Sequence, residues 1–133
     1  MNENNENISK KISYDDFAKI EIKAGKILSV EKIPDTDKLL KLIVDFAETT
    51  EVIDVEGNKT IISKPRQIVS GISLYFPDTA ILIGKICMFV TNLEPRMIRG
   101  YESDGMLFAL SDSQGKFSLL EPNDTIQIGT KAK

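Results

Sequence analysis

The chain has 133 residues, a formal net charge of −3, and neither histidine nor tryptophan. This length suits one domain whose core needs no disulfide or metal. The lack of histidine removes the commonest general base and metal ligand, so we expect no enzyme, no metal site and no cofactor. The single cysteine, Cys87, excludes an internal disulfide, and no segment is long enough to span a membrane. We expect a cytoplasmic protein.

The N-terminal segment divides into a tail and a helix. Residues 1–12 begin with alternating Asn and Glu and are expected to form a disordered tail, with a single domain over residues 13–133. Ser13 has the spacing of a helix N-cap, which predicts one or two helical turns. We expect Phe17, at the end of this segment, to cover one end of a sheet.

The first two strands are indicated by alternating apolar residues. Residues 19–32 have this pattern, with a bend expected at Gly25. Asp35 and Asp37 follow and are interpreted as turn formers rather than as a metal or acid–base pair. The positions expected to point inward on the two strands are Ile20, Ile22, Ala24, Leu28, Val30, Leu40, Leu42, Val44 and Phe46.

Residues 48–64 predict a β-hairpin, because two β-branched runs flank Glu56-Gly57-Asn58. This hairpin would be a ribbon that extends strands two and three. Its first arm carries carboxylates and should repel RNA phosphate. The composition favours a solvent-exposed decoration, and a contact with a protein is the alternative.

The remaining strands complete an all-β pattern. A short strand over residues 66–70 is followed by a helical turn that begins at Pro77 and ends at Gly84. A strand then covers residues 85–92, with Cys87 expected on its outward phase. The inward positions of this strand and the next are expected to be Ile86, Met88, Val90, Met106, Phe108 and Leu110. The pattern indicates a five-stranded Greek-key barrel with a short helix between strands three and four.

The stretch from residue 92 to 109 carries two of only three arginines, Arg96 and Arg99. Its Pro, Gly and Asp residues predict a loop whose polar groups face solvent or a partner. A guanidinium suits phosphate oxygens and stacks on bases. Residues 59–99 carry six basic residues against two acidic ones, so a basic face can exist on this acidic protein. A connecting loop with incidental charges is the alternative.

Three ordered motifs in the chain resemble a family of tRNA-binding OB-fold domains. They are Asn92-Leu-x-Pro-Arg-x-x-Arg-Gly-x-x-Ser-x-Gly-Met106, Pro34-Asp-x-Asp-Lys-Leu39 and Arg66-Gln-Ile-Val-Ser-Gly-Ile72. Such domains occur at the C-terminus of many methionyl-tRNA synthetases and as separate tRNA-binding proteins. The resemblance implies structure-specific, sequence-independent tRNA binding that assists an aminoacyl-tRNA synthetase, in cis or in trans. It implies tRNA contacts at Lys38, Arg66, Asn92, Arg96, Arg99, Ser103 and Met106.

Two other functions are compatible with the sequence. The related CsaA-type export chaperones bind unfolded polypeptide, and a dimerisation module that lacks RNA binding is a further alternative. Several members of the family are dimers, which makes a homodimer the expected state of this chain. The apolar residues expected at the dimer contact, or else capping the barrel's own end, are Leu119, Leu120, Ile126 and Ile128.

Overall fold

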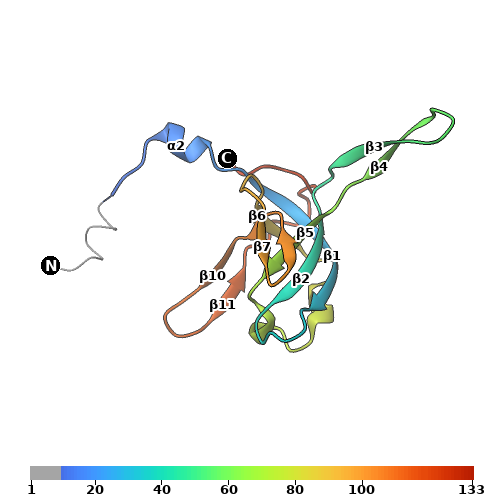
Figure 1. Cartoon of the computed structure of the whole chain (residues 1–133). Coiled ribbons are helices and arrows are strands. Elements are labelled where there is room, and N and C mark those ends of the chain that lie inside the picture. Colours follow the sequence, from blue (N-terminus) through green and yellow to red (C-terminus); the bar gives the residue numbers. More distant parts are fainter. Residues whose placement is uncertain (1–9) are drawn as a thin grey trace.

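A five-stranded antiparallel sheet forms the body of the protein in a computed structural model that describes residues 10–133. The expected tail, residues 1–12, therefore lies mostly outside the described residues. The order of the sheet is β5-β2-β1-β6-β9, and Figure 1 labels four of these strands, β1, β2, β5 and β6. These strands are β1 (Ile22–Lys32), β2 (Leu40–Asp45), β5 (Arg66–Ser70), β6 (Ile86–Val90) and β9 (Met106–Leu107).

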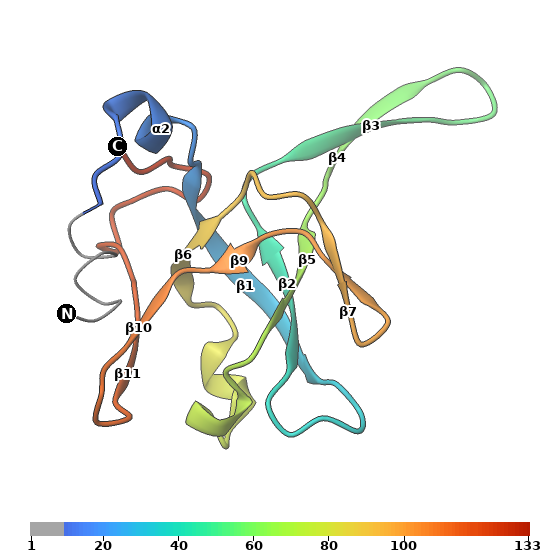
Figure 2. The same cartoon turned by 60° about the vertical axis from the view of Figure 1, so that its left-hand side comes forward.

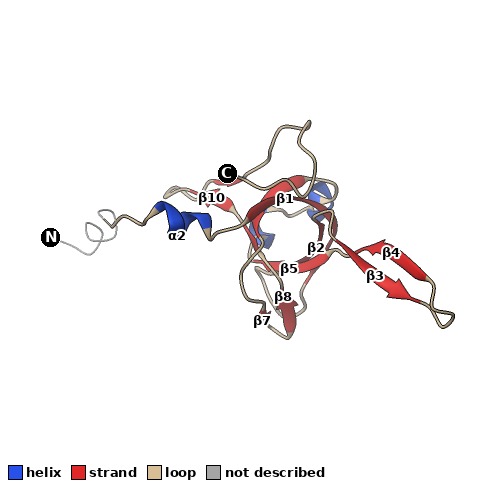
Figure 3. Cartoon of the chain, turned by 90° about the horizontal axis from the view of Figure 1, so that it is seen from above, coloured by secondary structure: helices blue, strands red, loops and turns tan. Residues whose placement is uncertain are grey.

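The sheet curls into a nearly closed barrel, as the view from above shows (Figure 3). Gly105, just before β9, packs against Ile68 of β5 and brings the two ends of the sheet together; a Cβ at this glycine would lie 2.9 Å from Ile68 Cδ1. The expected five-stranded barrel of the OB type is therefore confirmed.

Two short 3₁₀ helices, η1 (Ser73–Tyr75) and η2 (Thr79–Leu82), lie between β5 and β6 (Figure 2). The Asp78 carboxylate caps η2 by accepting the amide N–H of Ala80 at 3.1 Å. Gly84 follows with φ +88°, which glycine adopts without strain. Leu82 is fully buried, so η2 closes one end of the barrel, as the sequence predicted for a helix at this point.

The N-terminal helix α2 (Tyr14–Ala18) begins as predicted, because the Ser13 hydroxyl accepts the Asp16 N–H at 3.1 Å. The prediction that Phe17 covers the sheet was wrong, since its side chain is 46% exposed. Leu82 and Phe46 belong to the core cluster, whereas Phe17 lines a surface hollow with Ile22 and Lys131. The helix lies instead near the C-terminal residues (Figure 2).

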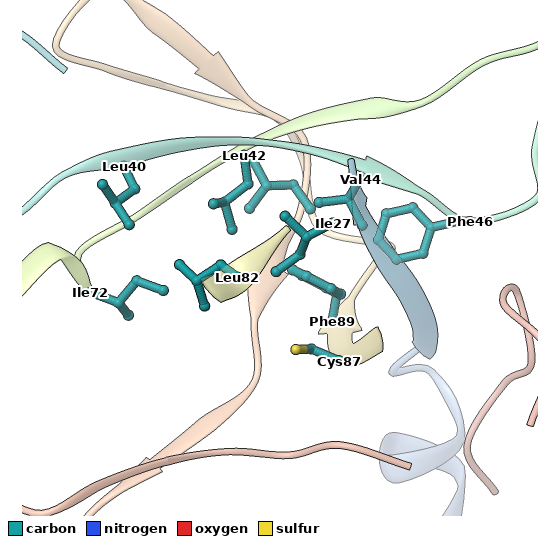
Figure 4. Close-up of a cluster of buried hydrophobic side chains, with 10 residues drawn as sticks. Ile27, Leu40, Leu42, Val44, Phe46, Ile72, Leu82, Cys87 and Phe89 are labelled. Atoms are coloured by element: carbon teal, nitrogen blue, oxygen red, sulfur yellow. The ribbon is translucent and has the colours of Figure 1, made fainter. Parts of the chain in front are cut away.

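The core occupies the interior of the barrel (Figure 4). Leu28, expected inside, is 42% exposed, whereas Ile27 is fully buried. The reason is a bulge between Ile27 and Ser29, which shifts the register of β1 against β2 and reverses the phase of the strand. The clustered core residues are Ile27, Leu40, Leu42, Val44, Phe46, Ile68, Ile72, Leu82, Cys87 and Phe89.

The expected phase was also wrong for Ile86 and Met88 of β6 and for β9, although Val90 is buried as predicted. Cys87 and Phe89 are fully buried, while Ile86 and Met88 are half-buried on the outer side. Cys87 is therefore a core residue, and its burial raises the pKa of the thiol to about 11. After β6, the exposed fractions of Met106, Phe108 and Leu110 are 49%, 42% and 58%, and Leu107 packs against the core. Both phases of these strands are apolar, so alternation alone does not distinguish inside from outside.

Three two-stranded hairpins project from the barrel (Figures 1 and 2). The predicted ribbon is β3 (Thr49–Ile53) with β4 (Lys59–Ser63). The stretch expected to be a loop contains a second hairpin, β7 (Arg96–Ile98) with β8 (Tyr101–Ser103). The third is β10 (Ala109–Ser111) with β11 (Phe117–Leu119). None of the helices described over residues 10–133 is long and apolar enough to cross a membrane.

Candidate nucleic-acid interface

The β7–β8 hairpin is fastened to the barrel along β8. The buried Ser103 hydroxyl accepts the Val69 N–H at 2.9 Å and donates to the Gly105 carbonyl at 3.2 Å. The Gln67 side chain donates to the Glu102 carbonyl at 3.0 Å, and the Asp104 N–H donates to the Gln67 carbonyl at 2.8 Å. The base of the hairpin is therefore fixed on β5, and its tip extends into solvent.

The tip of this hairpin is a two-residue turn formed by Arg99 and Gly100. Both have positive φ, +51° and +86°, and Ile98 pairs with Tyr101 across the turn. These dihedral angles match the twist of the flanking strands, which explains why a Gly-containing segment forms a hairpin instead of a loop. The turn presents the exposed Arg99 side chain at the outermost point of the hairpin.

Arg99 and Lys38 border the same hollow, of about 390 Å³, although they are 61 positions apart in the sequence. Asp35 and Asp37 also line it, from the turn that leads into β2. Within the described residues, neither Lys38 nor Arg99 has a carboxylate oxygen within 4.0 Å, so both positive charges are free to bind an external anion.

Arg96 lies at the start of β7 beside a smaller hollow of about 90 Å³. Among the described residues its guanidinium likewise has no carboxylate within 4.0 Å. The lining residues include Val69, Leu93, Ile98 and the half-exposed Met106. An apolar floor beside a guanidinium is an arrangement on which a nucleotide base can stack.

Tyr101, which the sequence did not single out, joins this surface from β8. Lys41 Nζ lies 5.6 Å from the centre of its ring and 3.2 Å from Glu31 Oε1. The partially exposed ring therefore lies between a lysine of β2 and the tip of the hairpin. The only sequence signal for Tyr101 was an aromatic residue two positions after Arg99. Its closeness to Lys41 depends on the fold.

Arg66 has most of its hydrogen-bonding capacity used inside the protein. Its Nε and Nη2 donate to the two oxygens of Glu48, each at 2.7 Å, and Nη1 donates to the Thr91 carbonyl at 2.6 Å. The guanidinium lies over the Phe46 ring at 5.4 Å and the side chain is 16% exposed. Hydrogen bonding to Glu48 raises the pKa of Arg66, and the same bonds lower the pKa of Glu48.

Asn92 also makes internal contacts. Its side-chain oxygen accepts the Glu21 N–H at 2.8 Å and its amide donates to the Lys19 carbonyl at 2.5 Å. Asn92 thus holds the segment before β1 against the end of β6.

The residues predicted to bind tRNA therefore fall into two groups. Lys38, Arg96, Arg99 and Met106 are exposed around the β7–β8 hairpin, whereas Arg66, Asn92 and Ser103 hold structure together.

A nearly closed five-stranded barrel in this strand order, with an exposed cationic hairpin on one side, is the architecture of the OB class. Over the described part of the chain, no group of three or more Cys, Asp and Glu residues is placed to hold a metal ion. The chain belongs to the family described as "Putative tRNA binding domain", whose model matches residues 22–131.

The similar proteins are consistent with this family. The chain is 44% identical over 123 residues to a methionine–tRNA ligase of Methanoregula boonei, which covers 92% of this chain but 16% of the ligase. A MetRS-related protein of Pyrococcus horikoshii has a similar structure, with a TM-score of 0.75, 33% identity, and coverage of 93% of this chain and 99% of that one. The CsaA chaperone of Picrophilus torridus has a TM-score of 0.71 and 26% identity over 92% of this chain and its own full length.

Proposed function

We propose that this chain binds tRNA by its shape and phosphate path, without reading base sequence, and thereby assists a methionyl-tRNA synthetase in cis or in trans. The domain itself is proposed to be non-catalytic. A folded RNA presents ordered phosphates that a protein can contact without reaching base edges. The chain spans about one sixth of the length of the ligases it matches. We therefore assign to it an auxiliary role in their activity.

The observation that carries this proposal is a group of cations around the β7–β8 hairpin that have no carboxylate within 4.0 Å among the described residues. Lys38, Arg96 and Arg99 come from two distant segments and are all exposed. Tyr101 and Met106 provide an aromatic and an apolar surface beside them. Three cations that neutralise about three phosphates imply that log K falls by roughly 2 to 3 per log unit of salt.

The test is a mobility-shift titration with total tRNA at two salt concentrations. We expect Arg99→Ala and Lys38→Ala each to weaken binding about three- to tenfold and to reduce the salt slope by about 0.7 to 0.9. Lys116→Ala, a matched control in the exposed β10–β11 turn, should leave both quantities unchanged. Unchanged tRNA binding in Arg99→Ala would contradict the proposal.

The alternative of peptide binding, as in a CsaA-type chaperone, is tested in the same material. The likeness to the Picrophilus torridus chaperone and the apolar hollow at Met106 are the observations that favour it. Binding of an apolar peptide that is insensitive to salt, together with no binding of tRNA, would support the chaperone function instead.

We also propose that two copies of the chain pair through an apolar outer face. Phe108 and Leu110 point away from the core, beside the half-buried Met88. Ile126, in the C-terminal segment, is 38% exposed. Leu119 packs against the core and Leu120 and Ile128 are half-buried, so the terminal segment also closes the barrel's own side. Exposed apolar faces of this kind commonly mark protein contacts.

A further inference from the structure

The β3–β4 hairpin has no role in the interface described above, yet it is the most prominent projection of the molecule (Figure 1). We propose that one face of this hairpin docks onto the body of a methionyl-tRNA synthetase, meaning the part of such an enzyme that lies outside the segment similar to this chain. The proposal rests on the proposed function. The docking face consists of Thr50, Val52, Thr60 and Ile62.

The pairing register defines the two faces of the hairpin. Thr50 is opposite Ile62 and Val52 is opposite Thr60, so these four side chains point to the same side. Glu51 opposite Ile61 and Ile53 opposite Lys59 form the other side. The first face carries only uncharged β-branched residues, and the second mixes charged and apolar ones.

The apolar side chains of this hairpin are exposed to an unusual degree. Val52 and Ile62 on the uncharged face are 45% and 44% exposed, although both residue types prefer burial. Ile53 and Ile61 on the other face are 60% and 68% exposed, but each is paired across the strands with a charged residue. Apart from each other, β3 and β4 make no extensive contact with another described element, and they project clear of the barrel (Figure 3). A two-stranded ribbon is only marginally stable alone in water. A partner that covered the uncharged face would account for apolar residues at the exposed positions 52 and 62.

The root of the hairpin is rigid, which suits a docking element. Glu48, just before β3, holds Arg66 through two hydrogen bonds of 2.7 Å, and its carbonyl accepts the Lys64 N–H at 2.8 Å. The hairpin is therefore fixed in direction relative to β5, which also carries the β7–β8 hairpin. A rigid projection loses little conformational entropy when it binds.

Charge favours a protein over RNA as the occupant. Among the described residues, Glu51 and Glu56 have no basic group within 4.0 Å. Asp54 accepts the N–H groups of Glu56 and Asn58, each at 2.9 Å, and keeps a carboxylate at the turn. These carboxylates lie at the turn and on the opposite face, where they repel phosphate, and they match a partner whose apolar strip ends at Lys or Arg side chains.

The synthetase body is the partner for two reasons. In the similar ligases, the region matching this chain is about 16% of the length, so most of the protein lies outside it and is available for contact. A tRNA held at the β7–β8 hairpin has to be presented to that body. A second contact through the β3–β4 hairpin would raise the effective concentration of the bound tRNA at the enzyme without using the RNA interface.

The test measures binding between this chain and the methionyl-tRNA synthetase of the same organism, from which any segment similar to this chain has been removed. Isothermal titration should show binding to the native chain. The double variant Val52→Thr/Ile62→Thr keeps the charge and the β propensity, and it should bind about tenfold more weakly or worse. The matched variant Ile53→Thr/Ile61→Thr changes the opposite face and should remain within about threefold of the native chain.

Three outcomes would overturn the proposal: no binding of the synthetase body by the native chain, no loss in the Val52/Ile62 variant, or equal losses in both variants. All four side chains are exposed, so neither double variant should unfold the chain. Melting curves on both variants check this. A tRNA titration on the same variants should show no change. If the Val52/Ile62 variant loses tRNA binding instead, or only self-association, the occupant is RNA or a second copy. If the native chain fails to bind tRNA, the proposed function fails, whatever the result for the hairpin.

Discussion

The Arg66 guanidinium illustrates how one neighbouring carboxylate changes the use of an arginine. Three of its donor groups bond to Glu48 and Thr91, and its face lies on Phe46. A phosphate would have to displace Glu48 from a bidentate pair that is largely shielded from water. Arg66 therefore serves to join the root of the β3–β4 hairpin to the barrel. Arg96 and Arg99, by contrast, have no carboxylate within 4.0 Å among the described residues.

The Glu48–Arg66 pair makes stability depend on pH. The folded state lowers the pKa of Glu48, chiefly through the Arg66 hydrogen bonds, so the folded state binds fewer protons at this site than the unfolded chain does. The stabilisation is therefore complete above the usual carboxylate pKa and is lost as the pH falls through the lowered value. We expect Glu48→Gln to reduce the free energy of unfolding by about 2 kcal/mol at pH 7.

Urea unfolding between pH 7 and pH 3 checks this prediction. The native protein and the Glu48→Gln variant should differ at pH 7 and approach each other below about pH 4. Glu51→Gln, which removes an exposed carboxylate that has no basic partner within 4.0 Å among the described residues, is the control and should match the native protein throughout. A difference between native and Glu48→Gln that stays constant with pH would show that the ion pair is not its source.

At the scale of elements, the β7–β8 hairpin depends on a turn that few residues adopt. Arg99 has a left-handed conformation, which costs a residue with a Cβ about 1 kcal/mol or more, and Gly100 supplies the second positive φ. Replacement by glycine at position 99 would relieve that cost but would remove the side chain. The turn therefore accepts local strain and places a guanidinium at the tip of the hairpin.

Gly100→Ala tests the link between this turn and RNA binding. Nothing lies within 4 Å of the added Cβ, so the effect comes from backbone strain at φ +86° alone. We expect about threefold to tenfold weaker tRNA binding, because about 1 kcal/mol of strain changes the tip conformation. Gly57→Ala in the β3–β4 turn has the same φ and equally open surroundings, and should leave tRNA binding unchanged. Equal effects of the two substitutions would contradict this role of the turn.

Local chemistry made several elements predictable. The Ser13 cap, the Asp78 cap with Gly84 and the turn at Gly57 each depend on residues close in sequence, and all three appear in the structure. The phase of β1 was not predictable, because the bulge after Ile27 arises from pairing with β2. On β6, Cys87 and Met88 are both apolar, so only the closed barrel decides which of them is buried.

The candidate site was predictable in its location but not in the role of each residue. The arginines of residues 92–109 marked the exposed surface, and Lys38, which the resemblance also singled out, lines the same hollow as Arg99. Arg66, Asn92 and Ser103 have the residue types of a binding site, yet each bonds to a residue on a distant part of the chain, 18 to 73 positions away. Sequence motifs do not show which donors are already used, because these contacts form only when the barrel closes.

At the scale of the whole molecule, the acidic net charge and the cationic surface are compatible, because they occupy different parts of the fold. The carboxylates of the β3–β4 hairpin project on one side of the barrel, and the β7–β8 hairpin extends from another (Figure 3). A net charge of −3 limits non-specific attraction to RNA, while the local cations attract phosphate over about one Debye length, roughly 8 Å at physiological salt. RNA binding should therefore require an RNA whose shape brings its phosphates to the tip of the β7–β8 hairpin.

The proposed homodimer would place two such hairpins on one particle. Phe108→Thr/Leu110→Thr removes apolar surface from the outer face without disturbing the core, since the side chains are 42% and 58% exposed. Sedimentation should show a dimer for the native chain and a monomer, or a dimer at least about tenfold weaker, for the variant. Leu74→Thr alters a leucine that is 65% exposed in η1 and should leave the native dimer intact. A dimer of unchanged strength in the Phe108/Leu110 variant would place the contact elsewhere.

The monomeric variant should also bind tRNA more weakly wherever one RNA engages both hairpins, because the second contact is then lost.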